Sequence, residues 1–221
     1  MDVNRRALLA SVAAALLPAG LPWHAVAAGA WGIPWARVPD VAVLSARGDS
    51  RLPLVSDAVA FWNQTFSELG SGFHLGSVTV AGGTIPAADL MALSGAVLGQ
   101  AAMPMPSLLS GMPGRIVVAL SDGNFVSFSD RWPAQSTALV AIKSDRSPPL
   151  TQPNVARNVI AHEIGHAIGL GHNGDPAMLM CGRPASCRPD VFASPTPHYF
   201  PLTANEKAEL LRMYPVSWRP Q

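Results

Sequence analysis

Three histidines and one glutamate lie close together in an order suited to binding a metal ion. Residues 162–172 read His-Glu-Ile-Gly-His-Ala-Ile-Gly-Leu-Gly-His. On a helix His162 and His166 are one turn apart, so their imidazoles can converge on one ion. Glu163 follows His162 by about 100° of rotation, which places its carboxylate beside the metal rather than on it. A carboxylate in that position can accept a proton from metal-bound water.

The third histidine requires the chain to turn soon after the second. His172 is six residues beyond His166, and a straight helix would not return it to the same face. Gly169 can adopt the positive φ that ends a helix, and Gly171 adds freedom before His172. Three imidazoles plus water give a tetrahedral zinc site with one exchangeable position, as catalytic sites have. The sequence therefore predicts one catalytic Zn²⁺ held by His162, His166 and His172.

The alternative interpretation is that these histidines are ordinary core residues of a helix. The chain has 19 glycines and 6 histidines in 221 residues. Given a His-Glu-x-x-His start, chance would supply the further glycine and histidine only about twice in a thousand cases. The alternative also leaves unexplained an acidic residue on an otherwise apolar helix. Metal binding is the better interpretation.

Hydrophobic periodicity predicts the elements that must position the motif. Apolar residues at three- and four-residue steps predict a helix over 54–69, and the zinc helix is expected to begin near Pro153. A further helix is predicted at 87–98. Strands are predicted at 41–44, 73–80, 115–120 and 137–142, with an edge strand at 124–129.

The elongated histidine motif resembles that of the metzincin clan of zinc peptidases. That clan has a methionine turn under the metal, and Met180, eight residues after His172, fits this role. The segment 202–214 is similar to the C-terminal helix of matrixins, the matrix-metalloproteinase-like family, and Thr203 with Glu206 makes a capping box at its start. The resemblance covers roughly residues 41–215, and it is specific over 162–180.

This resemblance implies a fold and an activity. The fold would be α+β and zincin-like, with a twisted, mostly parallel five-stranded mixed sheet, two long helices and a small C-terminal helical subdomain at 173–221. The activity would be that of a zinc-dependent endopeptidase, in which Glu163 acts as general base on zinc-bound water. A peptide or protein substrate would bind extended alongside the edge strand at 124–129.

Two other functions would use the same residues. A zinc-dependent binding or toxin-like module would hold a partner without turnover, although such a site has no use for Glu163 as a base. A different hydrolase, such as an exopeptidase or an amidase acting on cell-wall peptides, would need the same zinc and the same base. The position of the cut in the product separates the last function from an endopeptidase.

Other metal ligands find less support in the sequence. Cys181 and Gly182 follow Met180 where some metzincins have a tyrosine ligand, so no tyrosine ligand is assigned. Only two histidines besides the three ligands remain after residue 27, so a second, structural zinc is not expected. Calcium could bind four aspartates, although solvated loop carboxylates are the simpler interpretation of these residues: Asp122, Asp130, Asp145 and Asp175.

The first 27 residues have the features of an export signal. Arg5 and Arg6 precede an apolar run at 7–17, and residues 25–27 (Ala-Val-Ala) offer a signal peptidase its small-x-small pattern. We expect cleavage before residue 28; a buried N-terminal helix is the alternative. The run is too short to cross a bilayer, which takes about 20 residues. The mature protein would be periplasmic or extracellular, and the paired arginines resemble a twin-arginine signal.

Two cysteines and the composition complete the prediction. In an exported protein, Cys181 and Cys187 most naturally form one disulfide; metal ligation is the alternative. With 49% hydrophobic residues the chain can bury a sizeable core. Without the first 27 residues, 13 basic residues balance 13 acidic ones, which argues against a nucleic-acid partner. We expect a monomeric catalytic domain at 41–221 after a linker at 28–40, with no membrane association.

Overall fold

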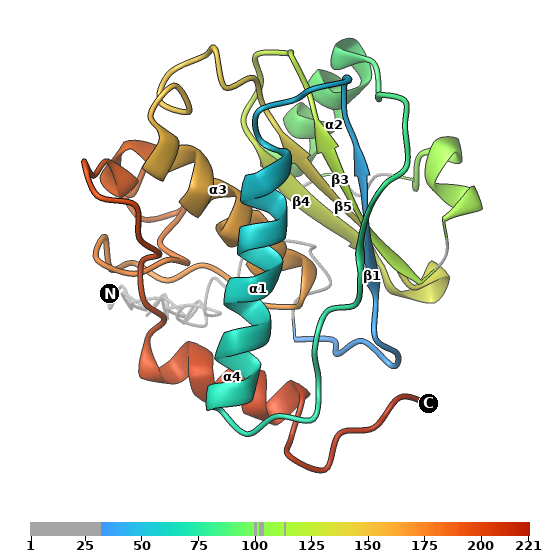
Figure 1. Cartoon of the computed structure of the whole chain (residues 1–221), viewed down its shortest axis with the longest axis vertical. Helices are drawn as coiled ribbons and strands as arrows, with labels where there is room; N and C mark the ends of the chain where they lie inside the picture. The colour runs from blue at the N-terminus through green and yellow to red at the C-terminus, as the bar shows by residue number, and fades with distance from the viewer. Residues whose placement is uncertain (1–31, 100, 102–103, 113) are drawn as a thin grey trace, which may run out of the picture.

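A five-stranded mixed sheet organises the part of the chain that the computed structural model describes, residues 32–99, 101, 104–112 and 114–221. The predicted signal at 1–27 lies outside these residues. The strand order is β2-β1-β3-β5-β4, and only β4 runs antiparallel to its neighbour (Figure 1). The strands are β1 (Asp40–Leu44), β2 (Val78–Val80), β3 (Arg115–Leu120), β4 (Phe128–Trp132) and β5 (Thr137–Ile142). The predicted α+β class with a mixed, mostly parallel sheet is confirmed.

Two long helices cover one face of the sheet, and a shorter helix covers the other. α1 (Leu52–Glu68) and α3 (Pro153–Ala167) pack together and share a core with alternate residues of the central strands. α2 (Ala87–Leu98) packs on the opposite face through Leu90 and Leu93. Because both faces are covered, β1, β3 and β5 are apolar on both sides. No described helix has the length and apolarity that a membrane crossing requires.

β2 is shorter than the strand predicted at 73–80. Phe73 instead stacks on Tyr214, with ring centroids 4.0 Å apart. The main chain of Leu75 exchanges hydrogen bonds of 2.7 and 3.0 Å with the side chain of Asn63 in α1. Phe73 and Leu75 therefore fill the core without joining the sheet.

The edge strand begins later than the predicted range of 124–129. β4 pairs with β5 from Phe128, opposite Ala141, onward. Phe125 and Phe128 both enter the apolar cluster beneath α2, with ring centroids 6.2 Å apart. A three-residue step to the same side is incompatible with the two-residue alternation of a strand. The segment before Phe128 is therefore irregular, and the predicted position was wrong.

The end of α3 is anchored by residues from both ends of the described chain. Trp35 donates its indole N–H to the Ala167 carbonyl at 2.9 Å, and Tyr214 donates its hydroxyl to the Ile168 carbonyl at 2.8 Å. The Tyr214 oxygen also accepts the main-chain N–H of Trp35 at 3.1 Å. The described part of the linker predicted at 28–40 thus packs on the domain and helps to fix the end of the helix.

α4 (Ala204–Met213) is the only α-helix of the predicted C-terminal subdomain at 173–221. Its predicted capping box is confirmed: the Thr203 hydroxyl accepts the Glu206 N–H, and the Glu206 carboxylate accepts the Thr203 N–H. The described residues also form three short 3-10 helices, at Ser107–Gly111, Pro133–Gln135 and Pro189–Phe192.

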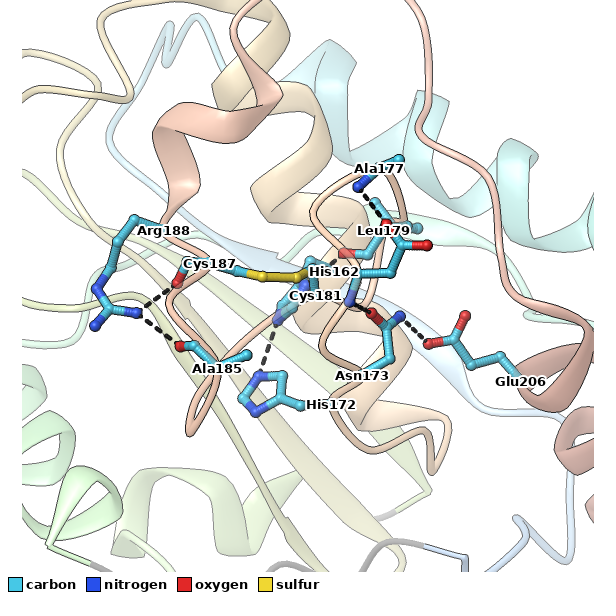
Figure 2. The surroundings of a disulfide bond; sticks show 11 residues. His162, His172, Asn173, Ala177, Leu179, Cys181, Ala185, Cys187, Arg188 and Glu206 are labelled. Atoms are coloured by element: carbon cyan, nitrogen blue, oxygen red, sulfur yellow. Dashed lines mark hydrogen bonds between the residues drawn. A yellow bond between two sulfur atoms is a disulfide. The ribbon is translucent and has the colours of Figure 1, made fainter.

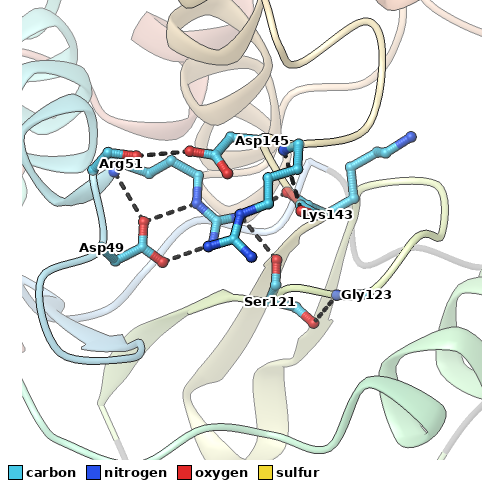
Figure 3. A network of polar contacts seen from close by, with 9 residues as sticks. Asp49, Arg51, Ser121, Gly123, Lys143 and Asp145 are labelled. Carbon is cyan, nitrogen blue, oxygen red and sulfur yellow. Dashed lines mark hydrogen bonds and ion pairs between the residues drawn. The ribbon is translucent and has the colours of Figure 1, made fainter.

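A buried arginine joins the start of α1 to the ends of two strands (Figure 3). Arg51 is 2% exposed, and its guanidinium donates to both carboxylate oxygens of Asp49 at 2.6 and 2.9 Å. It also donates to the carbonyls of Ser121 and Lys143, which follow β3 and β5, at 2.9 and 2.7 Å. This one side chain therefore satisfies three buried or half-buried acceptor groups.

We expect Arg51→Met to lower the free energy of unfolding by about 3–5 kcal/mol, because it leaves the Asp49 carboxylate without its buried partner. Denaturant unfolding followed by circular dichroism measures the loss. The control is Arg212→Met, which breaks an exposed pair with Glu209 and should leave the unfolding midpoint almost unchanged. Equal midpoints for the two variants would contradict the role assigned to Arg51.

Candidate metal centre

α3 holds two of the three histidines in a largely buried environment. Every residue from Asn158 to Ala167 is buried, because the helix packs on the sheet and on α1. Gly169 has a φ of +111°, and the Leu170 N–H returns to the Gly165 carbonyl at 3.0 Å. The helix therefore ends where the sequence predicted the chain would turn.

The three predicted ligands converge through their Nε2 atoms. The separations are 3.1 Å between His162 and His166, 2.9 Å between His166 and His172, and 3.2 Å between His162 and His172. Nitrogens that share a tetrahedral zinc ion at about 2.1 Å lie about 3.4 Å apart, so the observed spacing is close to that of a shared ion.

The hydrogen bonds of the other ring nitrogens show which atoms face the centre. The Nδ1–H of His162 donates to the Leu179 carbonyl at 2.7 Å, and that of His166 donates to the Leu170 carbonyl at 2.8 Å. Because a carbonyl can only accept, the protons are on Nδ1 and the lone pairs are on Nε2. Lone pairs that face one another at about 3 Å repel unless a cation lies among them. The cluster is therefore compatible with zinc binding.

Burial keeps the ligands in the neutral form that binds metals. Burial lowers the pKa of His162 to about 4, and the neighbouring His172 adds to this effect. Burial also lowers the pKa values of His166 and His172. Neutral imidazoles at pH 7 need not lose a proton before they coordinate an ion.

Glu163 lines the same cavity as the three ligands. It is 7% exposed and makes no hydrogen bond with any residue that the structure describes. Burial raises the pKa of its carboxyl to about 8. A buried carboxyl without a partner among the described residues costs stability.

Met180 packs directly against the helix that carries the ligands. It is fully buried, and a Cβ built on Gly165 would lie 2.6 Å from its sulfur. Gly165 lies between His162 and His166 in the sequence, so only a residue without a side chain lets the methionine approach there. Met180 therefore packs directly against the turn of α3 that lies between His162 and His166.

The predicted disulfide between Cys181 and Cys187 is confirmed, and it lies next to His162 and His172 (Figure 2). A second feature of this loop was not predicted. A Cβ on Gly182 would overlap the ring of His172, so the main chain passes directly against a predicted ligand. The main-chain N–H of Gly182 also donates to the Asn173 carbonyl at 3.1 Å.

Two further contacts that the sequence did not reveal fix the residues around the site. Asn173, which follows the third ligand, donates its amide N–H to the Glu206 carboxylate at 2.5 Å (Figure 2). Glu206 therefore joins the ligand loop to the start of α4. On α3, Asn154 and Asn158 bind the main chain of the 192–200 segment in four hydrogen bonds of 2.9 Å. Of the residues that make these contacts, only Glu206 was marked by the sequence, as part of the predicted capping box.

A cavity of about 320 Å³ opens above the metal centre. Phe125 and Phe128 line it from the segment that leads into β4, and residues 181–183 and 187–189 line it from the disulfide loop. Among the described residues, the three histidines are the only group of His, Cys, Asp or Glu that could hold a metal ion. The four aspartates considered for calcium do not form such a group.

Comparison with known proteins gives distant structural similarities. No protein-family model matches the sequence, and no curated protein matches it. The chain is similar to an archaemetzincin from Methanopyrus kandleri, at 21% identity over 80% of this chain and 96% of that one, with a TM-score of 0.44. It is similar to metalloproteinase-II from Bacteroides fragilis, at 15% identity over 82% of this chain and 54% of that one, with a TM-score of 0.46.

A third similarity is to a zinc-dependent peptidase from Methanocorpusculum labreanum, at 16% identity over 77% of this chain and 99% of that one, with a TM-score of 0.40. Identities of 15–21% with TM-scores of 0.40–0.46 assign no family. The function must therefore be inferred from the site itself.

Proposed function

We propose that the chain is a zinc-dependent endopeptidase of the metzincin type, closest to the matrixins. One observation carries the proposal: three neutral imidazoles converge on one point, and the carboxyl of Glu163, which binds no described residue, lines the same cavity. A zinc ion held by His162, His166 and His172 would supply a Lewis acid toward a peptide carbonyl and toward water.

Glu163 is the proton carrier in this mechanism. Its carboxylate accepts a proton from the attacking water as the new C–O bond forms at the peptide carbonyl. The same carboxyl then gives that proton to the amine nitrogen as the C–N bond breaks. Burial raises the pKa of this carboxyl, which strengthens it as a proton acceptor, whereas a cation bound at the three imidazoles would favour its ionised form.

β4 offers the main-chain groups that would hold an extended peptide. Within the described structure it is an edge strand that pairs only with β5, and Phe128 and Ser129 line the cavity over the metal centre. A substrate that adds as a further strand is held by its backbone on both sides of the scissile bond. This mode of binding favours an internal cut over a terminal one.

A binding module without turnover fits the site less well. Such a module needs the three ligands, but it gains nothing from a buried carboxyl that binds no described residue.

Met180 would support the ligand-bearing turn from below. The disulfide and the sequence features of residues 1–27 support export to the periplasm or the exterior, where disulfides persist.

We expect the purified mature protein to contain one zinc per chain and to cleave an unfolded protein substrate. A chelator should abolish the cleavage, and added zinc should restore it, because the three imidazoles are the proposed metal ligands. Elemental analysis gives the metal content, and mass spectrometry of the products shows whether the cuts are internal. Full activity after removal of the metal would refute the proposal; exclusively terminal cuts would replace it with an exopeptidase.

A further inference from the structure

The cavity above the metal centre concentrates positive charge. Of the described residues, three cationic side chains line it, Lys143, Arg183 and Arg188, and Glu163 is the only acidic one. The chain as a whole has a net charge of only +1. The excess of cations is therefore a local property of this cavity.

None of the three cations is neutralised by an ion pair within the described part of the chain. The ion pairs found there involve Arg51, Arg157 and Arg212. Lys143 donates its ammonium N–H to the Pro148 carbonyl at 3.1 Å. Arg188 donates through Nη1 to two carbonyls of its own loop, at 2.6 and 3.1 Å. These carbonyls position the cations but cancel no charge.

The cations are close to the reacting centre. Arg183 directly follows Gly182, whose main chain lies against the ring of His172. Arg188 follows the second cysteine of the disulfide, and Figure 2 shows its guanidinium bonded to the carbonyls of Ala185 and Cys187. Lys143 follows β5, so the positive charge comes from two separate segments. A charged group of the substrate near the scissile bond would meet this field.

We propose that the cleft selects peptides that carry a carboxylate close to the scissile bond. The inference rests on the proposed peptidase function and names its substrate class. A cavity lined by one sign of charge attracts the opposite sign and disfavours lysine or arginine at the same place. An internal Asp or Glu side chain and a free C-terminal carboxylate share this chemistry, so the test must distinguish them.

Peptide binding to the Glu163→Gln variant tests the inference without turnover. Four fluorescent peptides would share the rest of their sequence. Three have a free C-terminus and carry Glu, Gln or Lys near the centre. The fourth is the Gln peptide with an amidated C-terminus. We expect the Glu peptide to bind about five- to ten-fold more tightly than the Gln peptide and the Lys peptide to bind most weakly. The Glu preference should shrink between about 0.05 and 0.5 M salt.

The responsible cations can be tested one at a time. Arg188→Gln and Arg183→Gln should each reduce the Glu-over-Gln preference about two- to five-fold, whereas Arg188→Lys should keep most of it. Arg219→Gln is the matched control, because Arg219 also donates through Nη1 to two carbonyls of its own segment, those of Val216 and Trp218. It does not line the cavity, so the preference should be unchanged.

The outcomes separate the inference from the function on which it rests. A difference confined to the free and amidated C-termini would assign the cations to the terminal carboxylate, which supports the inference and makes the cut terminal. Equal affinities for all four peptides, the amidated one included, would overturn it, even if the wild-type protein proves to be an active peptidase. An equal loss of preference in Arg219→Gln would also overturn it, since the effect would then follow net charge alone.

Discussion

The Glu163→Gln variant is expected to lose nearly all peptidase turnover while it keeps its metal. The amide has almost the same shape as the carboxyl, so the buried position beside the ligands should accept it. It cannot, however, accept a proton from water. Removal of a general base typically costs about a hundred- to ten-thousand-fold in rate. Initial rates with a fluorogenic peptide, together with zinc content, measure both parts of the expectation.

The control for this variant is Glu68→Gln at the exposed end of α1. This change also replaces a carboxyl with an amide, but in the described part of the chain the Glu68 carboxylate has a polar contact only with the Gln64 side chain. Its turnover should equal that of the wild type. A Glu163→Gln enzyme with an unchanged rate and a full complement of zinc would rule out Glu163 as the base and would reopen the question of what this site does.

The features that the sequence predicted correctly depend on residues close together in the chain. The four-residue step from His162 to His166 is a property of any helix, and the turn at Gly169 follows from one residue's backbone freedom. The disulfide joins two cysteines that are six positions apart in the sequence. The capping box of α4 is likewise local. Each of these required no knowledge of how distant segments pack.

The features that were wrong or missed depend on contacts between distant segments. Phe73 looked like a strand residue, but it packs on Tyr214 near the other end of the chain. Phe125 and Phe128 suggested alternation, but the surface beneath α2 takes both on the same side. The need for glycine at position 182 arises only because the His172 ring occupies the space of a side chain. Periodicity alone contains none of this information.

The cationic lining of the cavity is another feature that depends on how distant segments pack. Lys143 is separated from Arg183 by 40 residues in the sequence, and the overall charge is almost balanced. Only the fold brings Lys143 and the two arginines of the disulfide loop to one cavity. Local motifs therefore indicate the reaction, whereas the substrate preference depends on how the loops are arranged around the site.

Gly182→Ala is expected to lower the affinity for zinc at least about a hundred-fold, and activity with it. Changes to groups that only support a ligand already cost about 10- to 100-fold in metal affinity. Here the new methyl group would overlap ring atoms of the ligand His172 itself. Either the ring or the disulfide loop must move, and the three Nε2 atoms would no longer converge. Competition with a zinc-binding dye measures the affinity.

The local geometry makes this substitution a clean test, because Gly182 does not have the positive φ that would strain an alanine. The control is Gly95→Ala in α2, where a Cβ meets nothing within 4 Å. Alanine is the better helix former, so this control should be slightly more stable than the wild type, with unchanged zinc affinity. Circular dichroism should show that both variants keep the fold. If Gly182→Ala bound zinc as tightly as the control does, then His172 would not be held where the main chain of the disulfide loop confines it, and its assignment as the third ligand would fail.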